Sequence, residues 1–429
     1  MLYSAKPRQS SHSPAGITWL TVALLALALL ASDALAPVLS PVEGAGGNQG
    51  LQGGWAVDDA GNVDFDKSVY RNLSAMQDAG AGWVRINFRL GECFQTWTRR
   101  GCNGKTALQM YDQVIAEAQR RNLKVLGLLS NESWHGTQAQ WTASNGETTA
   151  GNGDNPYVRA FAKSAAGVLA GHYASKVPAW EVWNEPNAWT SLDASGNPVG
   201  GTFIYPSNFA WLLKRSYEAI KSVDPGMVVI AGGLFGHDIG GASVTVIEDG
   251  RFTPATKRGE AVGGARGPGR SAESTALACP TSLPSGADYL CATYEKGITK
   301  AKWRSGNYPF DHMGQHLYID QGGSTSSEKI SAYLQDLRAA YLLYEGAGTP
   351  KQTHLTEFGW QTPTGGLGEA TQANNLKVAY NTFRGTAYVG RAYWFSIQDV
   401  PGAFLYFGLL HDNGTMKPAF AAYQTAAAY

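Results

Sequence analysis

Two glutamates lie where segments with strand character end, in positions that could serve one reaction. Glu185 lies in WEVWNEPN and precedes Pro186, while Glu357 lies in THLTEF, two residues before Gly359. Two carboxylates that share a cavity can hydrolyse a glycosidic bond, one as the acid and the other as nucleophile or base. Each glutamate could equally cap the following helix or pair with an arginine, and spacing alone leaves both interpretations open.

A regular alternation of strand-like and helix-like segments surrounds these glutamates. The strand–helix pair repeats about eight times, which predicts an α/β fold: a single closed (β/α)8 TIM barrel. The alternative is an open doubly wound sheet. Such a sheet usually has G-x-G-x-x-G after its first strand, whereas the first turn here reads DDAGN. The predicted strands are 53–57, 83–88, 125–129, 179–183, 227–233, 313–318, 353–358 and 391–397.

The barrel would bring Glu185 and Glu357 to one place, because the C-terminal ends of its strands form a common mouth. Glu181 lies four residues before Glu185, so strand alternation puts it on the same face but deeper in the barrel. A buried carboxylate needs a partner. We therefore predict that Glu181 is a structural ion-pair or hydrogen-bonded residue and not a catalyst.

The motifs around both glutamates resemble those of the clan A retaining glycoside hydrolases. The resemblance is carried by WNEPN and TEFGW, and it is closest to family 39-like and family 5-like enzymes through EVWNEPN and AIKSVDPGMVVIAGG. It extends from about Gly53 to the closing string NGTMKPAF. The resemblance implies a (β/α)8 barrel with Glu185 as the acid/base and Glu357 as the nucleophile. It implies no metal and no organic cofactor.

The same resemblance implies roles for further residues. Asn184 would hold the sugar 2-hydroxyl, and Arg85 would lie beside the nucleophile and keep it ionised. Tyr318 would hydrogen-bond the nucleophile, and His316, on the same face of the same strand, would line the cleft. Trp394 would form an aromatic floor under the sugar. The alternatives are a buried ion pair for Arg85 and a place in the core for Trp394.

The chain is rich in aromatic residues, with 13 Trp and 20 Tyr. Flat aromatic faces suit sugar rings, but large aromatic side chains also fill cores. Trp189 and Trp360 closely follow the two catalytic strands and are predicted to be walls of sugar subsites. The segment SNESWHG brings further substrate-binding candidates to a predicted rim loop: Trp134, with Asn131, Glu132 and His135.

The first residues have the pattern of a secretory signal. Lys6 and Arg8 precede an apolar run over 17–31, and Ala34-Leu35-Ala36 stands before Pro37. We predict a signal peptide over 1–36, a flexible leader over 37–50 and a catalytic domain over 51–429. The protein is then secreted, either extracellular or periplasmic. An uncleaved anchor formed by 17–31 is the alternative, although that run is shorter than the ~20 residues that span a bilayer.

Export permits disulfides, and four cysteines allow three connectivities. Local pairing, Cys93 with Cys102 and Cys279 with Cys291, is preferred because each bond closes a single loop. No CxxC or HExxH spacing occurs, so no metal site is expected. The long span 238–309 between the fifth and sixth strands is predicted to be an insertion at the C-terminal rim.

The charge balance excludes one class of partner. Lys+Arg and Asp+Glu are 34 each, so nothing favours nucleic acid. The predicted function is a monomeric, retaining β-glycosidase that acts by double displacement on a β-linked polysaccharide or oligosaccharide outside the cytoplasm, such as a glucan, xylan, mannan or exopolysaccharide. A transglycosylase on the same barrel and a non-catalytic carbohydrate-binding barrel are the alternatives. A serine esterase would need G-x-S-x-G, which is absent.

Overall fold

A computed structural model gives the fold of the 429-residue chain. It describes residues 49–52, 69–134, 153–189, 191–192, 198–235, 244–246, 252–254, 285–362, 367–401 and 405–427. The chain divides into two compact units, Met1–Gly44 and Ala45–Tyr429, and all the described residues belong to the second. The predicted signal peptide (1–36) and residues 37–48 of the predicted leader lie outside the described residues.

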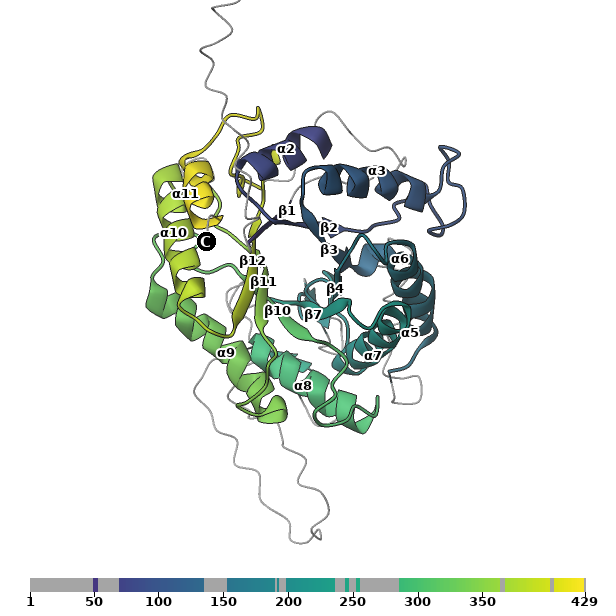
Figure 1. The fold of residues 1–429 in the computed structure, drawn as a ribbon. Helices are drawn as coiled ribbons and strands as arrows, with labels where there is room; N and C mark the ends of the chain where they lie inside the picture. The colour runs from purple at the N-terminus through teal and green to yellow at the C-terminus, as the bar shows by residue number, and fades with distance from the viewer. Residues whose placement is uncertain are drawn as a thin grey trace, which may run out of the picture. The chain divides into compact units, whose positions relative to one another are not determined.

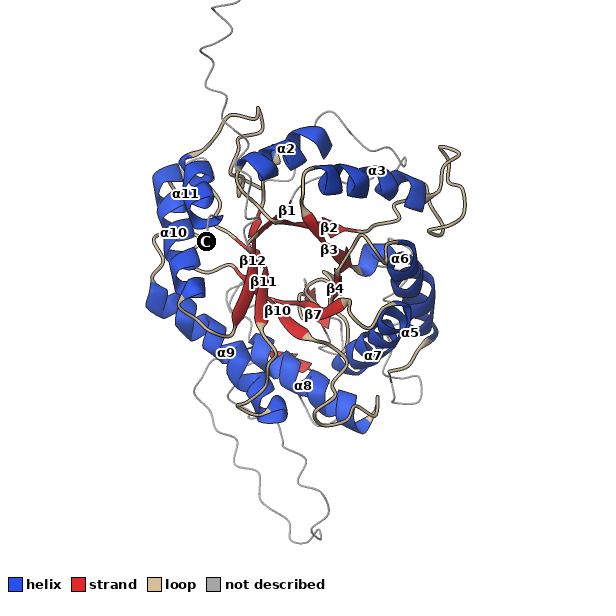
Figure 2. Cartoon of the chain, in the orientation of Figure 1, coloured by secondary structure: helices blue, strands red, loops and turns tan. Residues whose placement is uncertain are grey.

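The second unit is built around a closed barrel of parallel strands, seen along its axis in Figure 1 and coloured by element type in Figure 2. The order around the barrel is β1-β12-β11-β10-β7-β4-β3-β2, and β2 pairs with β1 to close it. The predicted (β/α)8 fold is confirmed. The barrel strands are β1 (Gly50–Gln52), β2 (Trp83–Asn87), β3 (Lys124–Leu129), β4 (Ala179–Val182), β7 (Val228–Leu234), β10 (His312–Leu317), β11 (Thr353–Phe358) and β12 (Val389–Phe395).

Helices surround the barrel and cover the outward faces of the strands (Figure 2). Two short two-stranded sheets, β5–β6 (Ser191–Leu192 with Pro198–Val199) and β8–β9 (Val244–Val246 with Phe252–Pro254), lie outside the barrel sheet. The helices are α2 (Arg71–Asp78), α3 (Ala107–Arg120), η2 (Asn131–Ser133), α5 (Pro156–Phe161), η3 (Ala162–Ala166), α6 (Gly167–His172), α7 (Pro206–Val223), α8 (Ser285–Thr299), α9 (Ser327–Glu345), α10 (Glu369–Arg384) and α11 (Pro418–Ala427).

Apolar side chains fill the inside of the barrel below the polar layer of the candidate site. Trp83, Leu126, Ala179, Ile230 and Tyr393 form a separate buried cluster, one from each of five strands. Inward-facing side chains of a barrel pack in layers of this kind, so the barrel has a solid core instead of a pore. Two positions further along β2 and β4, Arg85 and Glu181 begin the polar layer of the candidate site.

Some element boundaries differ from those predicted. The first strand is Gly50–Gln52, so it begins within the predicted leader and before the predicted strand 53–57, which lies outside the described residues. Helix α7 begins at Pro206, and Tyr205 before it makes no side-chain cap. Proline suits the first helical position because it has no N–H to leave unpaired.

The predicted insertion over 238–309 also needs correction. Its later part contains α8, which contacts both α7 and α9 and therefore takes the place of the barrel's own helix between β7 and β10. Residues 255–284 lie outside the described residues. The part of this span that is an insertion is thus shorter than predicted.

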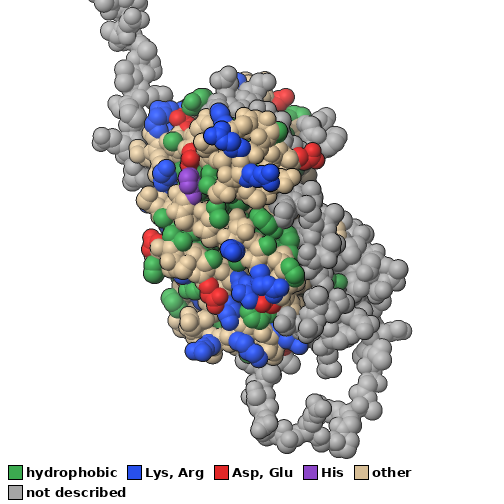
Figure 3. Space-filling model, turned by 90° about the vertical axis from the view of Figure 1, so that its right-hand side faces the viewer, with side chains coloured by type: hydrophobic (Ala, Val, Ile, Leu, Met, Phe, Trp, Pro, Cys, Tyr) green, Lys and Arg blue, Asp and Glu red, His purple; other side chains and the backbone are tan. Residues whose placement is uncertain are grey.

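The disulfide between Cys93 and Cys102 is present, with Cα atoms 5.2 Å apart. Cys279 lies outside the described residues, so its pairing with Cys291 stays a prediction. In the described parts of the chain, no helix combines the length and apolar character needed to cross a membrane. The face shown in Figure 3 carries scattered charged side chains among apolar and neutral ones.

Candidate active site

Arg85 on β2 is the centre of a buried polar layer above the apolar core of the barrel. Its Nε donates to Glu181 Oε2 at 2.6 Å, and its Nη1 donates to Glu357 Oε1 at 2.5 Å. Nη1 also reaches Gln52 Oε1 at 2.6 Å, and Nη2 reaches Asn184 Oδ1 at 2.9 Å. A planar guanidinium can hold several oxygens at fixed angles, so one side chain fixes four groups from three other strands or their ends.

Glu181 on β4 is fully buried and satisfied. One carboxylate oxygen pairs with Arg85 and the other accepts the backbone N–H of Gly233 at 2.9 Å. It lies below the mouth, two strand alternations before Glu185. The structural ion pair predicted for Glu181 is therefore confirmed. It balances part of the charge that Arg85 brings into the barrel.

Glu357, at the end of β11, has both carboxylate oxygens hydrogen-bonded. Oε1 accepts from Arg85, and Oε2 accepts from the Tyr318 hydroxyl at 2.8 Å. The side chain is nearly buried, with 10% of its surface exposed. The predicted neighbours of this glutamate, Arg85 and Tyr318, are thus both in contact with it.

Glu185 lies just beyond β4, where the backbone leaves strand geometry. Trp183 and Glu185 have positive φ angles of 76° and 45°. Such angles are costly for residues other than glycine and persist where the surroundings impose them. Here the Glu185 N–H donates to the Gly233 carbonyl at 3.1 Å, and the Glu185 carbonyl accepts the Thr202 hydroxyl at 2.9 Å. These bonds direct the side chain over the mouth.

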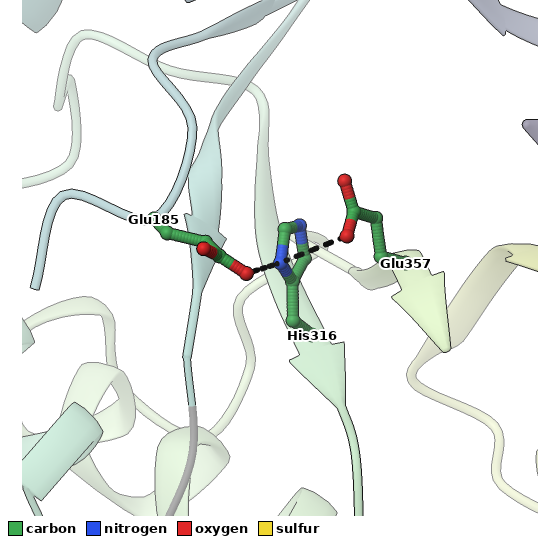
Figure 4. A group of neighbouring side chains, drawn as sticks. All are labelled: Glu185, His316 and Glu357. Atoms are coloured by element: carbon green, nitrogen blue, oxygen red, sulfur yellow. Dashed lines mark hydrogen bonds and ion pairs between the residues drawn. The ribbon is translucent and has the colours of Figure 1, made fainter. Parts of the chain in front are cut away.

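His316 on β10 lies between the two glutamates (Figure 4). Its Nδ1 is 2.8 Å from Glu185 Oε1 and 3.6 Å from Glu357 Oε2. One ligand atom from each of the three residues lies within 4.8 Å of the other two. A Cβ at Gly233 would come within 2.2 Å of His316 Nε2, so a glycine is required there for the ring to fit.

The two glutamates differ in their electrostatic surroundings. Burial raises the pKa of Glu185, and the nearby charge of Glu357 adds to this; the hydrogen bond from His316 opposes it only in part. Burial alone would also raise the pKa of Glu357. The positive charges of His316 and Arg85, with the hydrogen bonds from Tyr318 and Arg85, instead hold the pKa of Glu357 below its usual value. Glu185 is therefore disposed to keep a proton and Glu357 to lose it.

Two carboxylates and an imidazole are also ligands that a divalent metal can use. Arg85 and Tyr318 already donate to both oxygens of Glu357, and the guanidinium brings a positive charge into the same space. A cation would have to displace these donors. The arrangement of the described residues therefore fits proton transfer better than metal binding.

Two predicted sugar-binding tryptophans are not at the mouth. Trp394 is wholly buried and points outward from β12, where it packs on Phe358 and Trp360 and donates from Nε1 to the Phe407 carbonyl at 2.9 Å. Trp360 is also wholly buried. The predictions for both residues are wrong, because both rings belong to the layer between barrel and helices.

Phe395 occupies the place predicted for Trp394. It follows Trp394 by one residue and therefore points to the opposite face of β12. Its ring lies 6.3 Å from that of Tyr318, which also packs on Phe235 at 5.7 Å and Phe407 at 5.5 Å. These phenylalanines form an apolar wall beside Glu357. None of these phenylalanines was predicted from the sequence, although alternation counted forward from Tyr393, which faces the barrel interior, selects Phe395.

The two remaining predicted tryptophans, Trp134 and Trp189, are half-buried and pack against the edge of the core. Both follow strand ends of the C-terminal side, Trp134 after β3 and Trp189 after β4. Their positions are compatible with a rim role, which stays a prediction. His135, in the same rim segment, lies outside the described residues.

Several solved structures with a similar fold are glycoside hydrolases. A family 39 glycoside hydrolase from Bacteroides cellulosilyticus aligns with a TM-score of 0.52 and 16% identity over 83% of this chain and 60% of that chain. The endo-1,4-β-mannanase from Rhizomucor miehei aligns at 0.55 with 18% identity, over 89% of this chain and 93% of that one. GH5_18 from Streptomyces cattleya, in complex with GlcNAc, aligns with a TM-score of 0.56 and 15% identity, over 89% of this chain and 80% of that one.

These identities are low, so the likeness concerns the fold, and the chain spans about three fifths of the length of the family 39 enzyme. No match was found among curated protein sequences. The closed parallel barrel has two glutamates at its C-terminal mouth. Residues 275–423, which include Glu357, match the family described as the glycosyl hydrolase catalytic core. This match covers roughly a third of the chain and agrees with the resemblance drawn from the motifs.

Proposed function

We propose that the protein hydrolyses β-glycosidic bonds with retention of configuration at the anomeric carbon. The observation that carries this is the short separation of the two carboxyls: an oxygen of Glu185 and an oxygen of Glu357 lie within 4.8 Å of each other. Retaining enzymes have carboxyls about 5–5.5 Å apart, whereas inverting enzymes leave about 6.5–9.5 Å for a water. The opposite pKa shifts of the two groups also support a division into acid and nucleophile.

In the first step, a Glu357 oxygen attacks the anomeric carbon while the bond to the leaving oxygen breaks. The leaving oxygen keeps the electron pair of that bond and takes a proton from Glu185. Arg85 and Tyr318 donate to Glu357 and hold it ionised and oriented for this attack. Asn184, whose Oδ1 accepts from Arg85, binds the sugar hydroxyl next to the reacting carbon in this proposal.

In the second step, Glu185 acts as a base. Its carboxylate takes a proton from water, the hydroxide oxygen bonds to the anomeric carbon, and the bond to Glu357 breaks. His316 hydrogen-bonds Glu185 throughout this exchange and keeps the carboxyl over the reacting carbon. Two inversions at one carbon give net retention.

The proposed substrate is a β-linked polysaccharide or oligosaccharide outside the cytoplasm. The signal-like segment over 1–36 supports export, and the disulfide between Cys93 and Cys102 suits an oxidising compartment. The near-neutral charge balance gives no reason to expect a strongly charged polymer.

A hydrolysis screen over a panel of β-glucans, xylans, mannans and bacterial exopolysaccharides tests the function, with Glu357→Ala as the blank. Proton NMR of the first product formed tests retention. We expect the β-anomer to appear first and to equilibrate later. Transfer of the sugar to an added acceptor, at the expense of hydrolysis, would favour the transglycosylase. Activity that survives Glu357→Ala would refute the assigned nucleophile, and α-anomer formed first would refute retention.

Azide rescue separates the two glutamates, because a small anion can replace either carboxylate. For Glu185→Ala on an aryl β-glycoside with a good leaving group, we expect azide to attack the glycosyl-enzyme and give a β-glycosyl azide. For Glu357→Ala we expect direct attack and an α-glycosyl azide. The same azide anomer from both variants would contradict the assignment.

A further inference from the structure

The mouth of the barrel has two unlike walls. On β10 and its neighbours, Tyr318 is surrounded by Phe235, Phe395 and Phe407. β2 is four strands away from β10 in the barrel of eight and so lies across the mouth from it (Figure 2). At the end of β2, Asn87 follows Arg85 by one strand alternation, about 6.6 Å further toward the mouth. The second wall begins at this residue and is polar.

The polar wall consists of Asn87, Arg89, Ser130 and Glu132, which come from the ends of β2 and β3. The Ser130 hydroxyl donates to Asn87 Oδ1 at 2.8 Å, and Asn87 Nδ2 donates to Glu132 Oε2 at 2.8 Å. Arg89 Nε lies 3.3 Å from Glu132 Oε1. The wall therefore presents a carboxylate and a guanidinium in a fixed relation to each other.

The backbone under the wall is anchored from the core. The buried Tyr111 hydroxyl accepts the N–H of Arg89 at 2.9 Å and donates to the carbonyl of Asn87 at 3.0 Å. Trp97 Nε1 donates to the Ser133 carbonyl at 2.8 Å. The Leu90 N–H donates to the Glu132 carbonyl at 3.0 Å. Such support fixes a binding group before the ligand arrives, which reduces the entropy lost on binding.

The charged ends of the wall are accessible to solvent. The side chains of Arg89 and Glu132 are 25% and 30% exposed. An ion pair with this exposure adds only about 0–1 kcal/mol to the stability of the fold. Stability alone therefore does not explain why the backbone under this pair is anchored to the core. Glu132 accepts a hydrogen bond from Asn87 and forms an ion pair with Arg89. A carboxylate can take roughly four hydrogen bonds, so its remaining capacity suits hydroxyl donors.

We propose that the polar wall is a sugar subsite that binds a neutral pyranose through two neighbouring hydroxyl groups. The pyranose bound by the wall is the neighbour of the sugar that Glu357 attacks. The wall lies one strand alternation above Arg85, and Arg85 holds Glu357. Glu132 accepts from the hydroxyls and Arg89 donates to them. The proposal rests on the proposed function and adds to it a neutral, hydroxyl-bearing neighbouring unit.

The test compares oligosaccharides of increasing length from whichever polymer the protein hydrolyses. For the wild type, kcat/KM should rise when a unit is added that reaches the wall. In Glu132→Gln, the ratio of kcat/KM for the longer substrate to that for the shortest one should fall by about tenfold or more, because a hydrogen bond to a charged acceptor is replaced by a neutral one. Arg89→Gln is the second variant, and the same ratio should fall.

Glu117→Gln is the matched control. Glu117 also pairs with two arginines, Arg120 and Arg121, but it lies on α3 away from the mouth. It should leave the length ratio unchanged. Urea unfolding of each variant separates loss of fold from loss of binding. An unchanged ratio in folded Glu132→Gln and Arg89→Gln would overturn the subsite while leaving the proposed function standing. Absence of hydrolysis by the wild type on all polymers would overturn both.

Discussion

Glu185 and Glu357 have the same side chain but opposite tendencies to ionise, and their immediate neighbours explain the difference. Glu357 receives two charge-assisted or polar donors, Arg85 and Tyr318. Glu185 is held by one imidazole in a buried place. A double displacement needs one group charged and the other protonated near the working pH. The division of labour follows from the surroundings and not from the residue type.

Tyr318 gives a test of this division. The Tyr318→Phe variant removes the donor to Glu357 Oε2, which helps to lower the pKa of that carboxyl. The pKa of Glu357 should rise, because the hydrogen bond from Tyr318 favours the charged form of this carboxyl. Activity needs ionised Glu357, so the acid limb of the kcat/KM profile should move to higher pH. The profile is measured beside that of Tyr423→Phe, which removes a buried hydroxyl far from the site. An acid limb that does not move would contradict this role of Tyr318.

At the scale of elements, strand alternation places most of the site. Arg85 lies where the pattern predicts, because β2 pairs regularly with β3 over these residues. His316 and Tyr318 also face the site as predicted, although β10 shifts register against both β7 and β11. The pairing of β11 with β12 shifts register twice, between Thr353 and Leu355 and between Leu355 and Phe358. Such a shift depends on the neighbouring strand, so the sequence of one strand does not reveal it.

The prediction for Trp394 failed for a simpler reason. The likeness to barrel hydrolases suggested an aromatic residue at the end of this strand, and AYWF offers three. Trp394 is the largest of the three, but Tyr393 and Phe395 share the inward face. Aromatic residues are common on both faces of a barrel strand, since the outward face packs on helices. Composition alone therefore could not distinguish the sugar-facing ring from the core ring.

Paired substitutions at these positions test the corrected assignment. Trp394→Ala removes a wholly buried ring and should lower the free energy of unfolding by about 3–5 kcal/mol. Phe395→Ala removes a partly exposed ring at the mouth and should mainly lower kcat/KM, with a smaller loss of stability. Urea unfolding and steady-state kinetics on both variants give the comparison. If Trp394→Ala kept full stability and lost activity instead, the assignment would have to be reversed.

At the scale of the whole molecule, the two ends of the barrel contain histidines with different surroundings. His316 at the mouth lies between two carboxylates, and the charge of Glu357 and the bond to Glu185 raise its pKa against the effect of burial. Among the described residues, no carboxylate acts on His354, which lies near the start of β11. Its ring lies 4.8 Å from that of His312, and its Nδ1 accepts the backbone N–H of Arg391 at 3.2 Å. Burial, with the nearby His312 and Arg391, holds the pKa of His354 well below its ordinary value.

A lowered pKa in the folded state makes His354 neutral where the unfolded chain binds a proton. Its contribution to stability is therefore complete above the unfolded pKa, near 6.5, and is lost as the pH falls below that value, by up to about 1.4 kcal/mol per pH unit for one proton. Glu185 has a raised pKa and acts in the opposite direction, so the wild-type slope is a sum of both effects.

The difference in pH slope between the wild type and a His354 variant isolates the contribution of His354. We expect the free energy of unfolding of the wild type to fall more steeply between pH 7 and pH 5 than that of His354→Gln, which has no proton to bind there. His411→Gln, which changes a partly exposed histidine, should follow the wild-type slope. Urea unfolding at several pH values measures all three slopes. Parallel slopes for the wild type and His354→Gln would show that buried His354 does not contribute to the acid sensitivity of the fold. The loss of stability in acid would then come from other groups in the chain.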